Sequence, residues 1–117
     1  MSEFVTIVEH KGRKIVFFNC RGMAPDQVAA LFPEVTRTAL ENRINLICTD
    51  VTGSAADDAV KAAAAASTKA IQEAMGAMHS ALVGIKGLQR IIAQAIVKDQ
   101  FFAKTMAEAL DHLAAQA

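Results

Sequence analysis

The sequence predicts a single α/β domain, residues 1–117, in which a β-hairpin precedes alternating strands and helices. The first two apolar segments are rich in β-branched and aromatic residues and are joined by a short link that contains Gly12. From Ile44 onward, short apolar runs alternate with longer segments of helical spacing. Strands that alternate with helices are normally parallel and joined by right-handed crossovers. We therefore expect about five strands and four helices.

The hairpin is expected over Phe4–His10 and Lys14–Cys20, because Gly12 between them can adopt the positive φ of a tight turn. The next segment, Ala24–Arg43, spaces its apolar residues as a helix does. Pro33 lies inside this pattern and lacks the backbone N–H that a helix interior uses. We therefore expect a kink or two short helices here.

A buried strand is expected over Ile44–Val51, a short apolar run bounded by polar residues. The alanine-rich segment Ala55–Met78 follows, and alanine is the best helix former, so this segment predicts a long helix that stops at Gly76. Ser54 stands directly before it in Ser-Ala-Ala-Asp, a weakened capping-box pattern with Asp in the fourth place. We interpret Ser54 first as the cap of this helix, with a phosphorylation site or ligand contact as the alternative.

The rest of the chain continues the alternation. Ser80–Ile85 predicts a strand, Lys86–Gln100 an amphipathic helix, and Phe101–Lys104 a last short strand. Thr105 and Glu108 have the Thr-x-x-Glu spacing of a capping box, which marks the start of the terminal helix.

Composition excludes several classes of function. The net charge is zero and the pI is about 6.8, whereas nucleic acid and anionic membranes require a basic surface. No apolar run approaches the ~20 residues of a membrane span. The first residues include the acidic Glu3 and do not form a secretory signal, so we expect a cytoplasmic protein. Cys20 and Cys48 are interpreted as reduced, partly buried thiols, with a redox pair as the alternative.

Two stretches resemble the STAS domain, the fold of bacterial anti-anti-sigma factors. The stretch NLICTDVTGS, Asn45–Ser54, is similar to the family's apolar strand that ends in Asp-Val-Thr. Ser80–Leu113 is similar to the family's strand with Val-Gly, Gly-Leu-led helix, Phe-containing last strand and Glu-x-Ala-Leu-x-x-Leu terminal helix. The resemblance covers most of Ile44–Leu113 and is closest to small stand-alone STAS-like proteins. It implies a STAS-like fold and a non-enzymatic regulatory role with a protein partner.

Anti-anti-sigma factors carry a phosphorylatable serine at the start of their second helix, usually within Asp-Ser-Ser-Gly. This chain has no Asp-Ser-Ser-Gly, and its nearest equivalents by position are Thr52 and Ser54. The resemblance therefore supports the fold more strongly than it supports control by a kinase.

The candidate site follows from the predicted sheet. Open α/β sheets bind ligands beyond the carboxyl ends of their parallel strands. The loops at these ends carry Asp50, Thr52, Ser54 and Lys86, with Arg21 and Lys104 at the margin. Lys86 lies in Val-Gly-Ile-Lys-Gly-Leu, a pattern that serves a turn or presents backbone N–H groups to an anion.

Catalysis and metal binding are not expected. The three histidines are scattered at positions 10, 79 and 112, and none is placed to act as the base for Ser54. No pair of histidines or cysteines has metal-ligand spacing, so we expect no metal and no cofactor.

Two functions remain: a protein-interaction module, or a small-molecule or lipid-binding protein with an apolar pocket between sheet and helices. A flat surface around the second helix favours the first, and a pocket of about 300 Å³ or more favours the second. We also expect a homodimer with the helix Ala55–Met78 at or near the contact. That helix is apolar over more than half of its circumference, and such helices are normally buried on more than one side.

Overall fold

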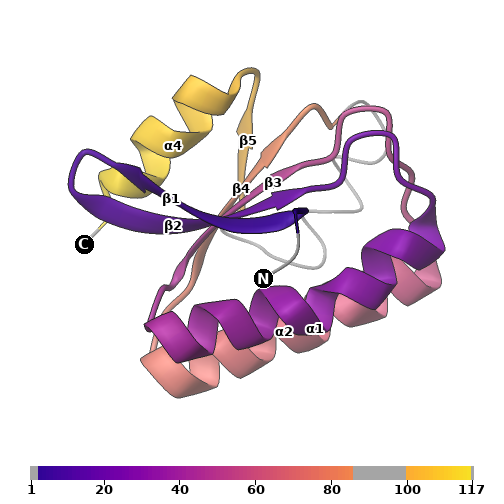
Figure 1. Ribbon diagram of the computed structural model, residues 1–117, viewed down its shortest axis with the longest axis horizontal. Helices are drawn as coiled ribbons and strands as arrows, with labels where there is room; N and C mark the ends of the chain where they lie inside the picture. The colour runs from indigo at the N-terminus through magenta and orange to yellow at the C-terminus, as the bar shows by residue number, and fades with distance from the viewer. Residues whose placement is uncertain (1–2, 86–99, 117) are drawn as a thin grey trace.

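A five-stranded sheet with helices on both faces forms the centre of the molecule, as the computed structural model shows for residues 3–85 and 100–116 (Figure 1). The strands lie side by side in chain order, from β1 at one edge to β5 at the other. In chain order the described elements are β1 (Val5–His10), β2 (Arg13–Asn19), α1 (Pro25–Asn42), β3 (Leu46–Asp50), α2 (Asp58–Met75), β4 (His79–Val83), β5 (Phe101–Ala103) and α4 (Met106–Ala114). The helix predicted over Lys86–Gln100 falls on residues 86–99, which are outside the described part.

The predicted hairpin and parallel strands are confirmed. β1 and β2 are antiparallel, in a register that runs from Val5 opposite Phe18 to His10 opposite Arg13. The strands β2, β3, β4 and β5 then pair in parallel. The turn places both Lys11 and Gly12 at positive φ, 51° and 78°. Two such residues in succession match the right-handed twist of the flanking strands.

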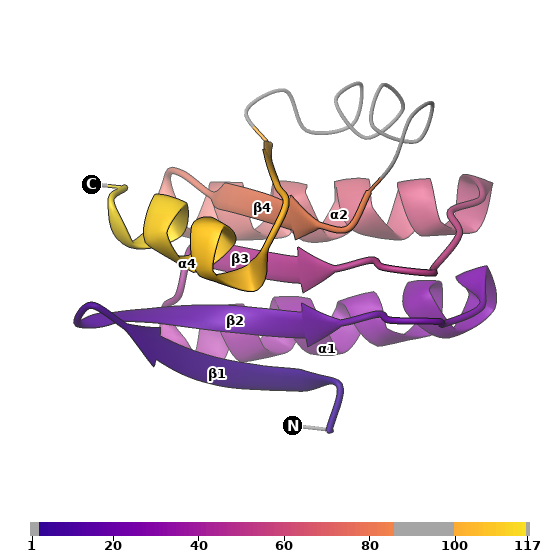
Figure 2. The same cartoon turned by 90° about the horizontal axis from the view of Figure 1, so that it is seen from above.

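The helices form two layers on opposite sides of the sheet. α1 and α2 lie next to each other on one face, and α4 lies on the other (Figures 1 and 2). β3 between these layers is buried at all five positions. On the α1 side, the ring of Phe18 meets that of Phe32 edge-on, with centroids 5.1 Å apart. On the α4 side, the sulfur atoms of Cys48 and Met106 are 3.6 Å apart.

Of the two outcomes expected at Pro33, a kink or two short helices, the second was wrong. α1 is one helix of 18 residues, and Pro33 lies exposed inside it. Its buried positions, Val28, Val35, Thr38 and Ala39, lie on both sides of the proline. Packing of this stripe therefore offsets the hydrogen bond that the proline cannot donate.

The expectation that Ser54 caps the second helix was also wrong. α2 begins at Asp58, and its cap is Asp57, whose Oδ1 accepts the Val60 N–H at 3.0 Å. The Ser54 N–H instead donates to the Val51 carbonyl at 2.9 Å, which forms a turn before the helix. Aspartate caps a helix as well as serine does, and its charge also favours the positive end of the helix dipole.

Two other predicted helix boundaries are confirmed, the end of α2 and the start of α4. α2 ends at Gly76, which has a φ of 82° and donates its N–H to the Gln72 carbonyl. The Thr105 hydroxyl accepts the Glu108 N–H at 3.1 Å and caps α4. No helix in the described ranges is both long enough and apolar enough to cross a bilayer.

Candidate functional site

The carboxyl ends of β2, β3 and β4 are tied together by backbone hydrogen bonds. The Cys20 N–H donates to the Asp50 carbonyl at 2.8 Å, and the Gly22 N–H donates to the Thr52 carbonyl at 3.0 Å. On the other side of β3, the Val51 N–H donates to the Val83 carbonyl at 2.9 Å. These bonds continue the sheet into its loops, which places Arg21 and Thr52 beside Asp50.

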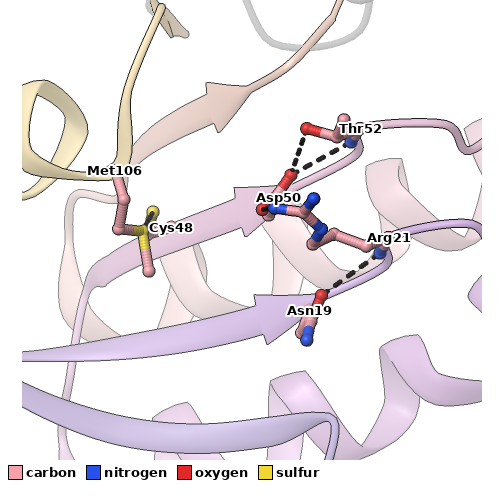
Figure 3. Close-up of polar contacts among 6 residues, drawn as sticks. All are labelled: Asn19, Arg21, Cys48, Asp50, Thr52 and Met106. Carbon is pink, nitrogen blue, oxygen red and sulfur yellow. Dashed lines mark hydrogen bonds and ion pairs between the residues drawn. The ribbon is translucent and has the colours of Figure 1, made fainter.

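Asp50 is the centre of this edge. Its side chain is only 9% exposed, and its Oδ1 accepts both the backbone N–H of Thr52 at 3.0 Å and the Thr52 hydroxyl at 2.7 Å. Its Oδ2 lies 3.5 Å from Nη1 of Arg21, whose side chain is 65% exposed. Figure 3 shows Arg21 and Thr52 reaching Asp50 from the loops after β2 and β3. Both oxygen atoms of the carboxylate thus have partners, and its hydrogen bonds to Thr52 hold the loop after β3 in place.

Gly84 is required by the position of Thr52. A Cβ atom at Gly84 would lie 2.0 Å from the Thr52 Oγ1 and 2.9 Å from the Thr52 Cα, and Gly84 has a φ of 84°. The backbone after β4 therefore passes directly over Thr52. The local sequence pattern predicted a turn or an anion-binding loop at this glycine but not its contact with Thr52, because that contact joins residues 32 positions apart in the chain.

Of the predicted site residues that the structure describes, Asp50 and Thr52 contact each other and Ser54 lies on the other face of the sheet. Cys48 contacts α4, whereas Ile47 and Thr49 line the space toward α1 and α2. Side chains alternate along a strand, so Asp50 lies on the α4 face. Ser54 instead borders the space on the α1 and α2 face.

Two lysines were also predicted near this edge of the sheet, Lys86 and Lys104. Lys86 lies outside the described residues. Lys104 is exposed after β5, and no ion pair joins it to Asp50.

A cavity of about 130 Å³ lies between the sheet and the two neighbouring helices. Its walls are mainly apolar, from Val28 and Phe32 of α1, Val60 and Ala64 of α2, and Leu82 of β4. Ligand pockets usually measure about 300–1,000 Å³, so this space is small for a metabolite or lipid.

The histidines lie away from the candidate hydroxyls. His10 and His79 are at the opposite edge of the sheet, because they end β1 and begin β4. His10 bonds to Asp111 at 2.6 Å, and the ring of His112 stacks on Phe101 with centroids 3.8 Å apart. Within the described residues, no group of three or more His, Cys, Asp or Glu side chains is arranged to hold a metal ion.

Both cysteines are free and buried. Burial, and after it the negative charge of Asp50, raises the pKa of Cys20 and of Cys48 to about 12. Both side chains therefore remain protonated thiols at neutral pH, and a thiol is a poor nucleophile. The register pairs Cys48 with Phe17, three residues before Cys20, so the two thiols are not opposite each other.

Comparison with known proteins supports the fold. No protein-family model matches this chain, and no curated protein is significantly similar in sequence. Among solved structures, one from Thermotoga maritima, described as a "putative anti-sigma factor antagonist", is similar with a TM-score of 0.68. It is 15% identical in sequence, and the match covers 96% of each chain. The predicted STAS-like α/β fold is thereby confirmed.

Proposed function

We propose that this chain is a non-enzymatic regulatory module that binds a partner protein through the carboxyl edge of its sheet. The fold is that of a protein described as an anti-sigma factor antagonist, a description that implies a protein target. At 15% identity this likeness carries the fold alone, so the proposal depends on the surface of this chain.

The observation that carries the proposal is the surface from Gly53 to Ala59. All of its residues are exposed except Ser54, which is half-buried, and three of them are alanines. The segment is nevertheless held in place, by Asp50 at one end and by the Asp57 cap at the other. An ordered, exposed surface with short side chains suits contact with another protein.

The charges of this surface indicate the chemistry of the partner. Asp57 and Asp58 are both exposed at the start of α2, and among the described residues the one cation paired with them is Lys61, at 3.7 Å from Asp58. We infer that the partner presents basic side chains to this acidic pair. Complementary charges of this kind mainly set specificity and the rate of association.

Of the two candidate hydroxyls, Ser54 is the one that we propose for phosphorylation. The Thr52 hydroxyl already donates to Asp50, and the Gly84 backbone lies against it. A phosphate on Ser54 would add negative charge beside Asp57 and Asp58 and would change the potential of the docking surface strongly.

A pull-down from an extract of the source cell tests the proposal. Asp58→Lys should reduce capture of the partner at least tenfold, because it reverses one charge of the acidic pair. Glu73→Lys is the matched control: it makes the same change on the same helix, at an exposed position in the last turn. Ser54→Asp should also change the amount captured. Equal capture by wild type, Asp58→Lys and Ser54→Asp would exclude this surface as the docking site.

The alternative function, binding of a small molecule or lipid, has less support. The cavity between sheet and helices is about 130 Å³, below the range that such ligands usually need. Its size therefore favours the interaction module.

A further inference from the structure

The outer surface of the helical layer carries an apolar groove between α1 and α2. The groove has a volume of about 630 Å³, and Pro33, Leu40, Ala63 and Ala66 line it. The Thr36 hydroxyl, which also lines it, donates to the Ser67 hydroxyl at 2.7 Å, so these polar groups satisfy each other. The groove thus offers apolar surface on the side of the helices that faces away from the sheet.

Leu40 makes this groove unusual for the surface of a small domain. Its side chain is 37% exposed, and among the described residues only one other large hydrophobic side chain, Phe4, is exposed to this degree. The alanines of α2 beside it leave room for another helix to approach closely.

Two opposite charges flank Leu40 on the same helix. Arg37, 62% exposed, comes before it, and Glu41, also exposed, comes after it. Within residues 3–85 and 100–116, Arg37 forms an ion pair with Glu34 at the long distance of 4.0 Å, and Glu41 has no ion pair. Both charges line the groove.

This pattern is complementary to itself. Arg37 and Glu41 are one helical turn apart, so two antiparallel copies of α1 that cross near Leu40 place Arg37 of each copy beside Glu41 of the other. The same crossing brings the two Leu40 side chains together and gives the isologous contact of a two-fold dimer. We propose that the occupant of the groove is a second copy of this chain, bound through α1 with α2 at its border.

The charges favour a second copy over a different protein. A groove for an unrelated partner has no need of an acid and a base at positions that a two-fold axis exchanges. The zero net charge of the chain also leaves little long-range repulsion between copies. Arg37, Leu40 and Glu41 lie at the C-terminal end of α1, whereas the acidic loop precedes α2 at the carboxyl edge, so the proposed contact leaves that loop accessible.

Sedimentation equilibrium on the purified full chain tests the proposal over a hundredfold range of concentration. The wild type should reach a mass near twice the 12.4 kDa of one chain. Arg37→Glu and Glu41→Arg should each raise the dissociation constant at least tenfold, because each places two pairs of like charges in the contact. Circular dichroism of each variant checks that the fold is retained, which we expect because both positions are exposed.

Restoring the charges gives the decisive result. The double variant R37E/E41R should dimerise as the wild type does, and so should an equimolar mixture of the two single variants. Recovery in the mixture requires pairing between chains, since a contact within one helix is not repaired by mixing. Lys104→Glu, an exposed charge reversal after β5, should leave the mass unchanged.

Three outcomes would overturn the proposal. One is a wild type that stays at one chain mass over the whole range. Another is a dimer that neither single variant weakens, and the third is a mixture of single variants that remains monomeric. A monomeric chain whose capture of a cellular protein is lost in Arg37→Glu would assign the groove to that protein instead. Asp58→Lys should leave the mass unchanged, which separates this test from that of the acidic surface.

Discussion

Thr52 occupies the space into which any Cβ atom at position 84 would project. Asp50 holds the Thr52 side chain there, because it accepts hydrogen bonds from both the hydroxyl and the backbone N–H of Thr52. A larger residue at position 84 would therefore clash with Thr52, so either the end of β4 or the loop after β3 would have to move. The geometry of the candidate site thus depends on the buried Asp50 carboxylate, on the Thr52 hydroxyl and on glycine at position 84.

Gly84→Ala should destabilise the protein by about 2–4 kcal/mol, because it adds a steric clash to the strain of a positive φ. Gly76→Ala is the matched control. Gly76 has nearly the same φ, 82° against 84°, but a Cβ there would meet no atom within 4 Å. We expect this control to cost about 1 kcal/mol. Equal losses for both variants in urea unfolding would show that the contact with Thr52 contributes nothing.

The cap of α2 gives a second prediction at this scale. Asp57→Ala should lower the free energy of unfolding by about 1 kcal/mol, since it removes the acceptor of the Val60 N–H. Ser54→Ala should change it by less than about 0.5 kcal/mol, because Ser54 contributes only its backbone to the turn before the helix. Thermal and urea unfolding of both variants measures the difference, and a larger loss for Ser54→Ala would restore Ser54 as the cap.

The sequence could place Asp50 and Thr52 at the carboxyl edge because alternating strands and helices predict parallel strands, whose carboxyl ends lie at the same edge of the sheet. It could not choose between Ser54 and Asp57 as the cap, since both residue types cap helices and the two lie only three positions apart. The role of Gly84 depends on a contact between distant segments, which no local pattern contains.

At the scale of elements, the β1–β2 hairpin is tied to α4 by a cluster of charges. Asp111 on α4 accepts a hydrogen bond from His10 at 2.6 Å and lies 3.1 Å from the Lys11 ammonium. The Arg13 guanidinium also donates to the carbonyl of Ala114, the last residue of α4, and to that of Gln116 after the helix. These contacts join the first and last elements of the chain.

The stability that the contacts of Asp111 with His10 and Lys11 contribute should depend on pH. Hydrogen bonds from His10 and Lys11 lower the pKa of Asp111 below its ordinary value of 3.8. A lowered carboxylate pKa adds stability that is present above the unfolded value and is lost as the pH falls through the folded value. The melting temperature of wild type should therefore exceed that of Asp111→Asn at pH 5, and the gap should shrink below pH 3.8. A gap that stays constant down to pH 2 would contradict the contact.

At this scale, α1 shows what local sequence patterns can and cannot predict. The spacing of Val28 and Val35 predicted the helix, and Pro33 predicted a break inside it. The helix nevertheless continues, because its buried stripe packs on both sides of the proline. Local preference was outweighed by tertiary contacts, which the sequence specifies only through the whole fold.

At the scale of the whole molecule, α2 packs chiefly against α1 and stands away from the sheet. Only Ser67 and Ile71 of its 18 residues are buried, although alanine dominates its sequence. Short side chains cannot fill the distance between a helix and a sheet, so the cavity of about 130 Å³ remains beneath it. The sequence predicted the helix but not the gap, since the gap depends on the relative positions of three elements.

Filling this cavity should stabilise the protein. Ala64 lines the cavity from α2, and Ala64→Met adds a flexible, unbranched apolar chain that adapts to an irregular space and favours a helix. Empty apolar volume costs stability because its walls lack contacts. We expect the free energy of unfolding to rise by about 1 kcal/mol. Ala62→Met makes the same change at an exposed position of the same helix, so it should alter stability by less than about 0.5 kcal/mol. Urea unfolding of both variants measures the difference, and a loss for Ala64→Met would show that the space beneath α2 cannot accept a side chain.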